Sequence, residues 1–437
     1  MAKRSLRILW GSEQPIRPTG YGVVSREMVR RLVERGHEVF VMGWDYNGED
    51  MKHEEGWTMV HAGIGAYGTD FTNGPGSPRT IDVNLARLRP DVYFSLIDPW
   101  FLGPMVQSCN MANVPHIAYL PIDGTPISRG WMNELKMVHT PLWMSDFGAD
   151  QFSAFVGRWS SEGSGPEHMR DPMLDRYVQQ PRDVLYHGVD LDVFKPVSRE
   201  QKMAWRQALG IGHWDTVFIS VARNTNRKQQ PRLLHAFRAM LDAHPNPQTV
   251  GLVLHTGDPT NTMGMGGWNL PEMLADLNLT QHVTFSDTST NPLHGIPRED
   301  MARLFAMADV HVLATGGEGF GVPSAEAMAC GLPIILPNNS TGPELVGRGG
   351  KRGELVKCAT TIVGPKWGVE MGLVDVRSLA DAMLALAIDP ETRERKGKEA
   401  RRFAEKRFDW DTIVEQAERL MLKATETPHP LGANTRV

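Results

Sequence analysis

The chain has 437 residues, of which 41% are hydrophobic and 22% are charged, and its formal net charge is −5. A chain of this length exceeds one ordinary hydrophobic core, so we expect two domains. The nearly balanced charge excludes a globally basic surface, and no stable binding of nucleic acid is expected.

Two further features bear on the compartment. The three cysteines, Cys109, Cys330 and Cys358, are widely spaced, which fits a reducing cytoplasm better than a disulfide framework. No stretch approaches the roughly 20 apolar residues that a membrane span requires. The sequence therefore predicts a cytoplasmic protein without a transmembrane segment, for which peripheral contact with a membrane stays open.

Strands and helices alternate along the first part of the chain, as is typical of a parallel α/β sheet. Strands are expected at Leu6–Trp10 and His37–Trp44, with an amphipathic helix at Val23–Arg35 between them. The loop before this helix contains Gly20 and Gly22 but lacks a G-x-G-x-x-G pattern, so a dinucleotide cofactor is not supported. The two glycines either make only a turn or let the backbone approach a ligand closely.

Two aspartates follow later strands of this part. Asp98 ends the strand that opens at Val92, and Asp123 follows the strand His116–Pro121. The carboxyl ends of parallel strands form the edge at which α/β sheets bind ligands. Asp123 is therefore the stronger and Asp98 the weaker candidate for contact with a substrate, although such aspartates can also simply bond loop amides.

The second part restarts the alternation. A strand at Thr216–Ala222 precedes the text ARNTNRK, which contains Arg223 and Lys228. A further strand is expected at Gly251–Thr256, and 338–376 should hold loops and weak strands. Two cations on a loop at a sheet edge are either solvated surface charges or stabilisers of a departing anion.

The most informative stretch is 308–337, ADVHVLATGGEGFGVPSAEAMACGLPIILP. It predicts a strand at Asp309–Thr315, a glycine-rich loop, a helix at Ser324–Cys330 and a second strand. Such a loop lets backbone amides approach a ligand, and the helix N-terminus favours an anion. Glu318 in the loop and Glu326 in the first turn of the helix can each accept two hydrogen bonds from a vicinal diol. Alone, either could merely be solvated or complement the helix dipole.

The text from Glu318 to Glu326, EGFGVPSAE, resembles the E-x7-E signature of retaining glycosyltransferases of family 4 (glycosyltransferase group 1), which have the GT-B fold. The resemblance covers most of the chain and is strongest at 183–196, 216–237 and 309–346. It implies two Rossmann-like doubly wound α/β domains that face each other across a cleft.

The resemblance also implies roles for individual residues. Glu318 would contact the donor sugar, Glu326 would bind the ribose hydroxyls, and Arg223 and Lys228 would bind the diphosphate. Many family members carry a histidine in the loop where this chain has Asp123, which we expect to contact the sugar or the acceptor hydroxyl. Further donor contacts are implied for the backbone of Gly20, Gly22, Gly319, Phe320, Gly321 and Val322.

Asp190 and Asp192 form a D-x-D pattern, which holds a metal in other glycosyltransferases. Here they lie in the text GVDLDVFKP, which resembles the interdomain linker of the GT-B family. GT-B enzymes generally need no metal, so neither a metal site nor a cofactor is expected.

The domain layout follows from these observations. We expect an N-terminal acceptor-side domain at 1–190, a nucleotide-sugar-binding domain at 191–407, a helix at 408–426 that crosses back to the first domain, and a disordered tail at 427–437. The predicted function is metal-independent, retaining transfer of a hexose-type sugar from a nucleoside-diphosphate sugar, as co-substrate, to a hydroxyl acceptor. The alternatives are a GT-B nucleotide-sugar epimerase and a non-catalytic sugar-nucleotide-binding protein.

Several properties stay open at this point. The base, the sugar and the oligomeric state are not specified by the sequence. The acceptor could be a lipid, a polysaccharide, a metabolite, a protein or a modified nucleobase.

Overall fold

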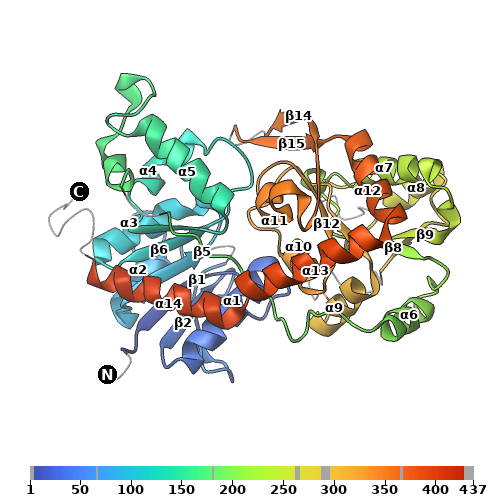
Figure 1. Ribbon diagram of the computed structural model, residues 1–437. Coiled ribbons are helices and arrows are strands. Elements are labelled where there is room, and N and C mark those ends of the chain that lie inside the picture. The colour runs from blue at the N-terminus through green and yellow to red at the C-terminus, as the bar shows by residue number, and fades with distance from the viewer. Residues whose placement is uncertain are drawn as a thin grey trace. The chain divides into compact units, whose positions relative to one another are not determined.

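The computed structural model describes residues 4–64, 67–179, 182–260, 266–286, 296–364 and 368–427. The chain divides into two compact units (Figure 1). Unit 1 comprises Met1–Ile122, Pro126–His187 and Trp410–Val437, and unit 2 comprises Asp123–Thr125 and Gly188–Asp409. The expected tail lies outside the described residues beyond Thr427.

Unit 1 is built on a seven-stranded sheet with the order β3-β4-β2-β1-β5-β6-β7. All neighbouring pairs are parallel except β3 and β4. The central strands β5 and β6 are buried along their whole length, as apolar strands of parallel sheets generally are. The strands are β1 (Arg7–Ser12), β2 (Glu38–Gly43), β3 (Met51–Lys52), β4 (Thr58–Val60), β5 (Val92–Leu96), β6 (His116–Leu120) and β7 (Thr140–Trp143), and the helices are α1 (Gly20–Glu34), α2 (Thr80–Leu88), α3 (Leu102–Ala112), α4 (Met132–Leu135), α5 (Asp146–Trp159) and α14 (Trp410–Glu426).

Helix α1 begins at Gly20, three residues before the expected start. The reason is its N-cap: the Thr19 hydroxyl accepts a hydrogen bond from the Gly22 N–H at 3.0 Å. Gly20 and Gly22 therefore lie in the first helical turn rather than in a loop. A side chain at position 22 would meet the carbonyl oxygen of Arg17 at 2.2 Å, so close packing accounts for this glycine.

Unit 2 contains a six-stranded parallel sheet with the order β10-β9-β8-β11-β12-β13 and a separate antiparallel pair, β14-β15. The predicted Rossmann-like α/β architecture is confirmed. The strands are β8 (Thr216–Val221), β9 (Val250–His255), β10 (Val283–Phe285), β11 (Val310–Val312), β12 (Ile334–Pro337), β13 (Gly353–Val356), β14 (Cys358–Val363) and β15 (Glu370–Val374), and the helices are α6 (Arg199–Ala208), α7 (Gln230–Ala243), α8 (Leu270–Asp276), α9 (Arg298–Met307), α10 (Val322–Ala329), α11 (Gly342–Val346), α12 (Val376–Ile388) and α13 (Pro390–Arg407).

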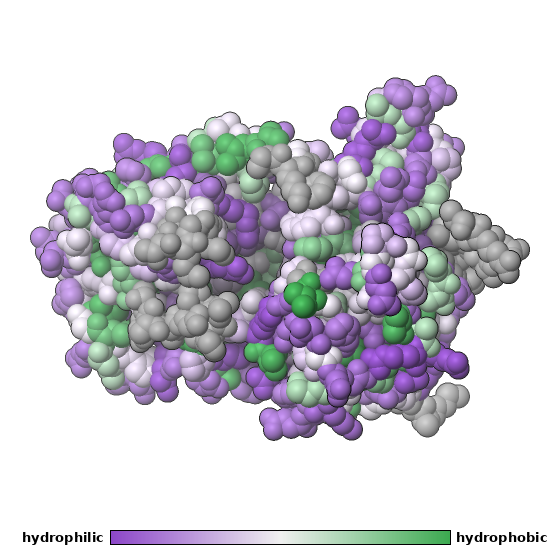
Figure 2. All heavy atoms as spheres, turned by 180° about the vertical axis from the view of Figure 1, so that it is seen from behind, coloured by the Kyte–Doolittle hydropathy of each residue, from purple (hydrophilic) through white to green (hydrophobic). Residues whose placement is uncertain are grey.

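The surface is mixed in polarity. Figure 2 shows one face on which hydrophilic side chains predominate and apolar ones are scattered. The large apolar side chains that are exposed include Ile362 and Val363 on β14. Within the described ranges, no helix combines the length and the apolar character that crossing a bilayer requires.

The C-terminal helix α14 follows unit 2 in the chain but belongs to unit 1, where it packs beside α1 (Figure 1). Its Glu418 is buried and lies 2.7 Å from Nη2 of Arg35 and 2.9 Å from Nε2 of His37. Nδ1 of His37 accepts a hydrogen bond from the Leu6 N–H at 3.0 Å, so Nε2 carries the proton that is donated to Glu418. One buried carboxylate thus connects α14 to the start of β1 and to the end of α1.

We expect Glu418→Ala to lower the free energy of unfolding of unit 1 by about 3 kcal/mol, because it leaves buried polar partners uncompensated. Glu415→Ala on the same helix is the control, since Glu415 forms an exposed ion pair with Arg419 and should change stability by less than about 1 kcal/mol. Urea denaturation followed by circular dichroism measures both. Equal losses in the two variants would contradict a specific role for Glu418.

Candidate active site

The loop between β11 and α10 is the centre of the candidate site. Strand β12 lies parallel to β11, so the expected βαβ unit is present. Helix α10 begins at Val322, two residues before the expected start, and Gly321 is its N-cap with φ 94°. Glu326 consequently lies beyond the first turn, contrary to expectation, and is too far along the helix to serve mainly as a dipole partner.

Three donors converge on one oxygen of Glu318. Oε1 accepts hydrogen bonds from Lys228 Nζ at 2.5 Å and from Thr315 Oγ1 at 2.7 Å. It also lies 3.2 Å from Nη1 of Arg227. The other oxygen, Oε2, has no hydrogen bond or ion pair among the described residues. One half of this carboxylate is therefore fixed, and the other half is available to a ligand.

The charge state of Glu318 follows from the same contacts. Burial alone would raise the pKa of its carboxyl, but the Lys228 ammonium and the Arg227 guanidinium outweigh burial and lower the pKa to about 2. The side chain is only 12% exposed. Glu318 is thus ionised at neutral pH and can only accept hydrogen bonds.

The basic residues of the site come from the segment that follows β8. Arg227 and Lys228 lie on the short helix η5 (Asn226–Lys228), and Arg223 lies shortly before it. Burial lowers the pKa of Lys228; the charges of Arg227 and Arg223 lower it further, and the Glu318 carboxylate opposes this shift. Lys228 thus lies beside Glu318. Arg223 lies on the same loop and is exposed, and its side chain forms no hydrogen bond or ion pair with any residue that the structure describes.

Arg227, like Thr315, contacts Glu318 but was not among the predicted site residues. Its guanidinium contacts both the carbonyl oxygen of Gly317 and the Glu318 carboxylate, and its own carbonyl accepts the Gly316 N–H at 2.7 Å. In the sequence, Arg227 is marked only by its position directly before Lys228 in a basic loop. That position does not show in which direction the side chain points. Arg227 thus connects the η5 loop to the loop after β11.

Asp123 belongs with the residues of unit 2. Its Oδ2 lies 4.0 Å from Nε of Arg227. Burial raises the pKa of its carboxyl; the Arg227 charge opposes this rise and the Glu318 charge adds to it. A side chain at Gly317 would meet the Asp123 carbonyl oxygen at 1.7 Å, so only glycine permits this approach.

The segment Asp123–Thr125 is held by strand β15 of the antiparallel pair β14-β15. The Thr125 N–H donates to the Glu370 carbonyl at 3.2 Å, and the Glu370 N–H donates to the Thr125 carbonyl at 2.7 Å. These strands lie where only loops and weak strands were expected.

Asp98, the weaker candidate, lies in unit 1 and accepts a hydrogen bond from the Tyr21 hydroxyl at 3.0 Å.

Glu326 is in a different environment from Glu318. Its carboxylate has no hydrogen bond among the described residues and is partly exposed. Burial raises the pKa of Glu326 to about 7, and the Arg298 charge at the start of α9 only partly opposes this rise. A carboxyl without a protein partner and with a perturbed pKa is a feature of ligand sites.

The backbone at the start of α10 offers further donors. The N–H groups of Gly319, Gly321 and Val322 make no hydrogen bond with other described residues. The Phe320 side chain is 3% exposed and packs edge-on against Phe408 at 5.5 Å, so only the backbone of this residue could reach a ligand. Free amides at a helix N-terminus suit a phosphate or another anion.

The D-x-D pattern has a local explanation. Oδ1 of Asp190 accepts hydrogen bonds from the N–H groups of Asp192 and Val193, both at 3.2 Å, and thereby closes a turn. Over the described part of the chain, no group of three or more His, Cys, Asp or Glu side chains is placed to hold a metal ion.

Comparison with known proteins extends this description. Residues 201–403 match the family model of the glycosyl transferases group 1. D-inositol 3-phosphate glycosyltransferase of Kribbella flavida is 30% identical over 257 residues, which cover 58% of this chain and 54% of that protein. A GDP-mannose-dependent monoacylated alpha-(1-6)-phosphatidylinositol monomannoside mannosyltransferase of Corynebacterium glutamicum is 27% identical over 52% of this chain and 53% of its own length. The chain thus spans about half the length of these curated relatives.

Solved structures match over nearly the whole chain. A glycosyltransferase of Rickettsia africae superposes with a TM-score of 0.68 at 13% identity and covers 97% of this chain and 100% of its own. HepE of Anabaena, in complex with UDP, gives a TM-score of 0.66 at 18% identity over 95% and 100% of the two chains. These similarities confirm the predicted GT-B fold. Residues 201–403, which contain Glu318, Glu326, Arg223 and Lys228, are thus similar to the glycosyl transferases group 1.

Proposed function

We propose that the protein transfers a hexose-type sugar from a nucleoside-diphosphate sugar to a hydroxyl acceptor, with retention of configuration and without a metal. The proposal rests on the different environments of the two carboxylate oxygens of Glu318. Its Oε1 is held by three donors, and its Oε2 has no partner among the described residues. An ionised oxygen held in this way is well suited to accept hydrogen bonds from sugar hydroxyls.

The same loop can hold a diphosphate. Arg223 and Lys228 supply positive charge, and the amides of Gly321 and Val322 lie at the N-terminus of α10. Groups of this kind stabilise the negative charge that grows on a leaving diphosphate. The names of the relatives support this class of donor, because one is GDP-mannose-dependent and HepE was solved in complex with UDP.

Retention would follow from the pose of the donor. Glu318 and the loop amides would hold the sugar beneath its own diphosphate, so that the acceptor attacks the face that the leaving group vacates. The departing phosphate can take the acceptor proton, so no side-chain base is required. Asp123, with Arg227 beside it, is the carboxylate that we place near the reacting hydroxyls.

Glu326→Ala should weaken binding of a nucleoside diphosphate by about tenfold or more, because the ribose hydroxyls lose their acceptor. Isothermal titration calorimetry with UDP and GDP measures this change. Glu391→Ala is the matched control, since Glu391 is an exposed carboxylate in the first turn of α13. Unchanged affinity for both diphosphates in the Glu326 variant would remove this residue from the nucleotide site.

Removal of divalent metals should leave turnover unchanged, because Arg223 and Lys228 supply the positive charge that a metal supplies elsewhere. Nucleotide release is measured after exhaustive chelation, with and without added manganese. Activity that disappears on chelation and returns with manganese would contradict metal independence.

Lys228→Ala should lower turnover at saturating donor by about 10²–10³-fold and weaken donor binding less, because charge on the diphosphate grows toward the transition state. Lys351→Ala is the control, since Lys351 is exposed and paired with Glu399. NMR of the new anomeric bond gives the stereochemistry. An inverted linkage would overturn the retaining mechanism, and wild-type turnover in the Lys228 variant would remove this residue from catalysis.

A further inference from the structure

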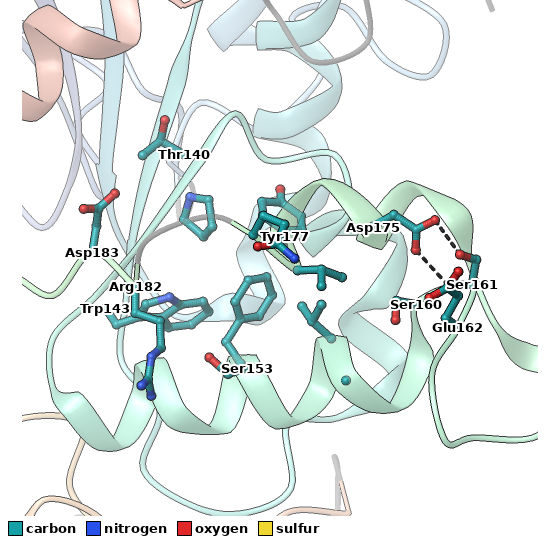
Figure 3. Close-up of a pocket in the computed structure, with 16 residues that line it drawn as sticks. Thr140, Trp143, Ser153, Ser160, Ser161, Glu162, Asp175, Tyr177, Arg182 and Asp183 are labelled. Atoms are coloured by element: carbon teal, nitrogen blue, oxygen red, sulfur yellow. Dashed lines mark hydrogen bonds between the residues drawn. The ribbon is translucent and has the colours of Figure 1, made fainter.

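Unit 1 contains a cavity of about 690 Å³ between β7, α5 and the short helix η4 (Pro172–Tyr177) (Figure 3). The lining rings of Trp143 and Phe152 are 2% and 6% exposed, so they present no free face to a ligand. The polar groups of the lining do not converge, because Ser160 lies at the opposite end of the cavity from Asp183 (Figure 3). The cavity therefore does not gather the groups of one binding site, in contrast to the loop after β12 in unit 2.

The loop after β12 holds the backbone on both sides of Gly317. The Ser340 hydroxyl accepts a hydrogen bond from the Glu318 N–H at 2.9 Å. One residue earlier in the chain, the side-chain amide of Asn339 donates to the Gly316 carbonyl at 2.9 Å. Two consecutive residues thus fix the two peptide groups that flank Gly317.

The two side chains of this loop also orient each other. The Ser340 hydroxyl donates its proton to Oδ1 of Asn339 at 3.3 Å, and its oxygen remains the acceptor for the Glu318 N–H. Ser340 is only 8% exposed, so little of it is open to competing water. Both the donor and the acceptor capacity of the hydroxyl are therefore used within the site.

Ser340 has a backbone conformation that is unusual for serine. Its φ is 40°, in the left-handed region where glycine is free of strain and a residue with a Cβ is not. Strained residues of this kind are found at functional sites. A glycine at position 340 would relieve the strain but would leave the Glu318 N–H without its acceptor. The hydrogen bond to Glu318 is thus the contribution that sets serine apart from glycine here.

A second residue with positive φ lies beside the same loops. Gln229, at φ 44°, donates to the Gly372 carbonyl at 2.7 Å and accepts the Val374 N–H at 3.0 Å. The Gly372 N–H in turn donates to the Gly316 carbonyl at 2.8 Å. Strand β15 and the loop after β12 therefore meet at the same carbonyl group, directly before the segment that carries Glu318.

Glu318 is consequently held at two points. Lys228 and Thr315 bond to Oε1 of its carboxylate, and Ser340 bonds to its backbone N–H. Fixing both the carboxylate and the backbone restricts the rotations between them. The second oxygen, Oε2, is thereby kept in one direction, as a preorganised acceptor requires.

We propose that Ser340 is a positioning residue of the donor site, which fixes the backbone of Glu318 so that Oε2 meets the hydroxyls of the donor sugar. This role rests on the proposed function, because that function gives Oε2 the donor sugar as its ligand. Ser340 acts on the sugar through Glu318. Loss of its hydroxyl should therefore impair handling of the sugar and leave the nucleotide contacts assigned to Glu326 intact.

Ser340→Ala should lower turnover at saturating donor by about tenfold, because one hydrogen bond that preorganises Glu318 is lost. The affinity for UDP and GDP should change by less than about twofold. Nucleotide release from a panel of UDP- and GDP-sugars measures turnover, and isothermal titration calorimetry measures affinity. A merely structural role would lower turnover and diphosphate affinity together.

Ser378→Ala is the matched control. The Ser378 hydroxyl also accepts a backbone N–H, that of Lys357 at 3.0 Å, but it makes no printed contact with the loop of Glu318. This variant loses the same kind of hydrogen bond and should keep native turnover.

Ser340→Gly separates the hydroxyl from the backbone strain. Glycine suits a φ of 40°, so this variant should be no less stable to heat than Ser340→Ala and should lose turnover to the same extent. Native turnover in either Ser340 variant, or a loss of diphosphate affinity equal to the loss of turnover, would overturn the positioning role.

Amide hydrogen exchange at Glu318, followed by NMR, tests the hydrogen bond without any reaction. Exchange should be at least about tenfold faster in Ser340→Ala than in the native protein and in Ser378→Ala. Unchanged exchange would overturn the inference. If the native protein releases no nucleotide from any donor of the panel, the proposed transfer fails instead, and the exchange rates still decide whether Ser340 holds Glu318.

Discussion

The ion pair between Glu318 and the η5 cations is the interaction on which the site depends. A carboxylate that is 12% exposed is tolerated only if charge and hydrogen bonds compensate for its lost hydration. Lys228 and Arg227 come from the loop after β8, and Thr315 comes from the loop after β11. Because β8 and β11 are neighbours in the sheet, the pair holds two adjacent strand ends at a fixed distance. Every other group of the site is placed relative to these two loops.

The parts of this arrangement that depend on local chemistry could be predicted from the sequence. Glycine and proline mark the loop around Glu318 and the start of α10, and apolar β-branched runs mark the strands on either side. The positions of the helix starts were predicted less accurately. Helix α1 starts early because Thr19 caps it, and α10 starts early because Gly321 adopts a left-handed conformation before Val322. Both shifts depend on a single capping residue, which periodicity does not detect.

The parts that depend on tertiary contacts could not be predicted. Arg227 and Arg223 lie in the same basic loop, and the contact of the Arg227 side chain with Glu318 distinguishes the two. Asp123 joins unit 2 because Thr125 pairs with Glu370, more than two hundred residues later in the chain, and because Gly317 leaves room for its carbonyl oxygen. The cavity in unit 1 likewise arises from residues of β7, α5 and η4 that carry no common sequence pattern.

The two glutamates of the motif illustrate how one spacing yields two kinds of carboxylate. The pKa of Glu318 is lowered to about 2, so its charge stabilises the folded state above its ordinary pKa, and this contribution disappears as the pH falls toward 2. The pKa of Glu326 is raised to about 7, so the folded state loses stability as the pH rises from its ordinary pKa to 7. At neutral pH one carboxylate is therefore compensated within the protein, and the other is not. Hydroxyl donors from a ligand would compensate for the charge of Glu326, so the free energy lost in holding it unpaired is recovered on binding. The folded protein thus compensates for the charge of Glu318 itself, whereas Glu326 has no side-chain partner among the described residues, and this difference is what the proposed role of Glu326 in binding rests on.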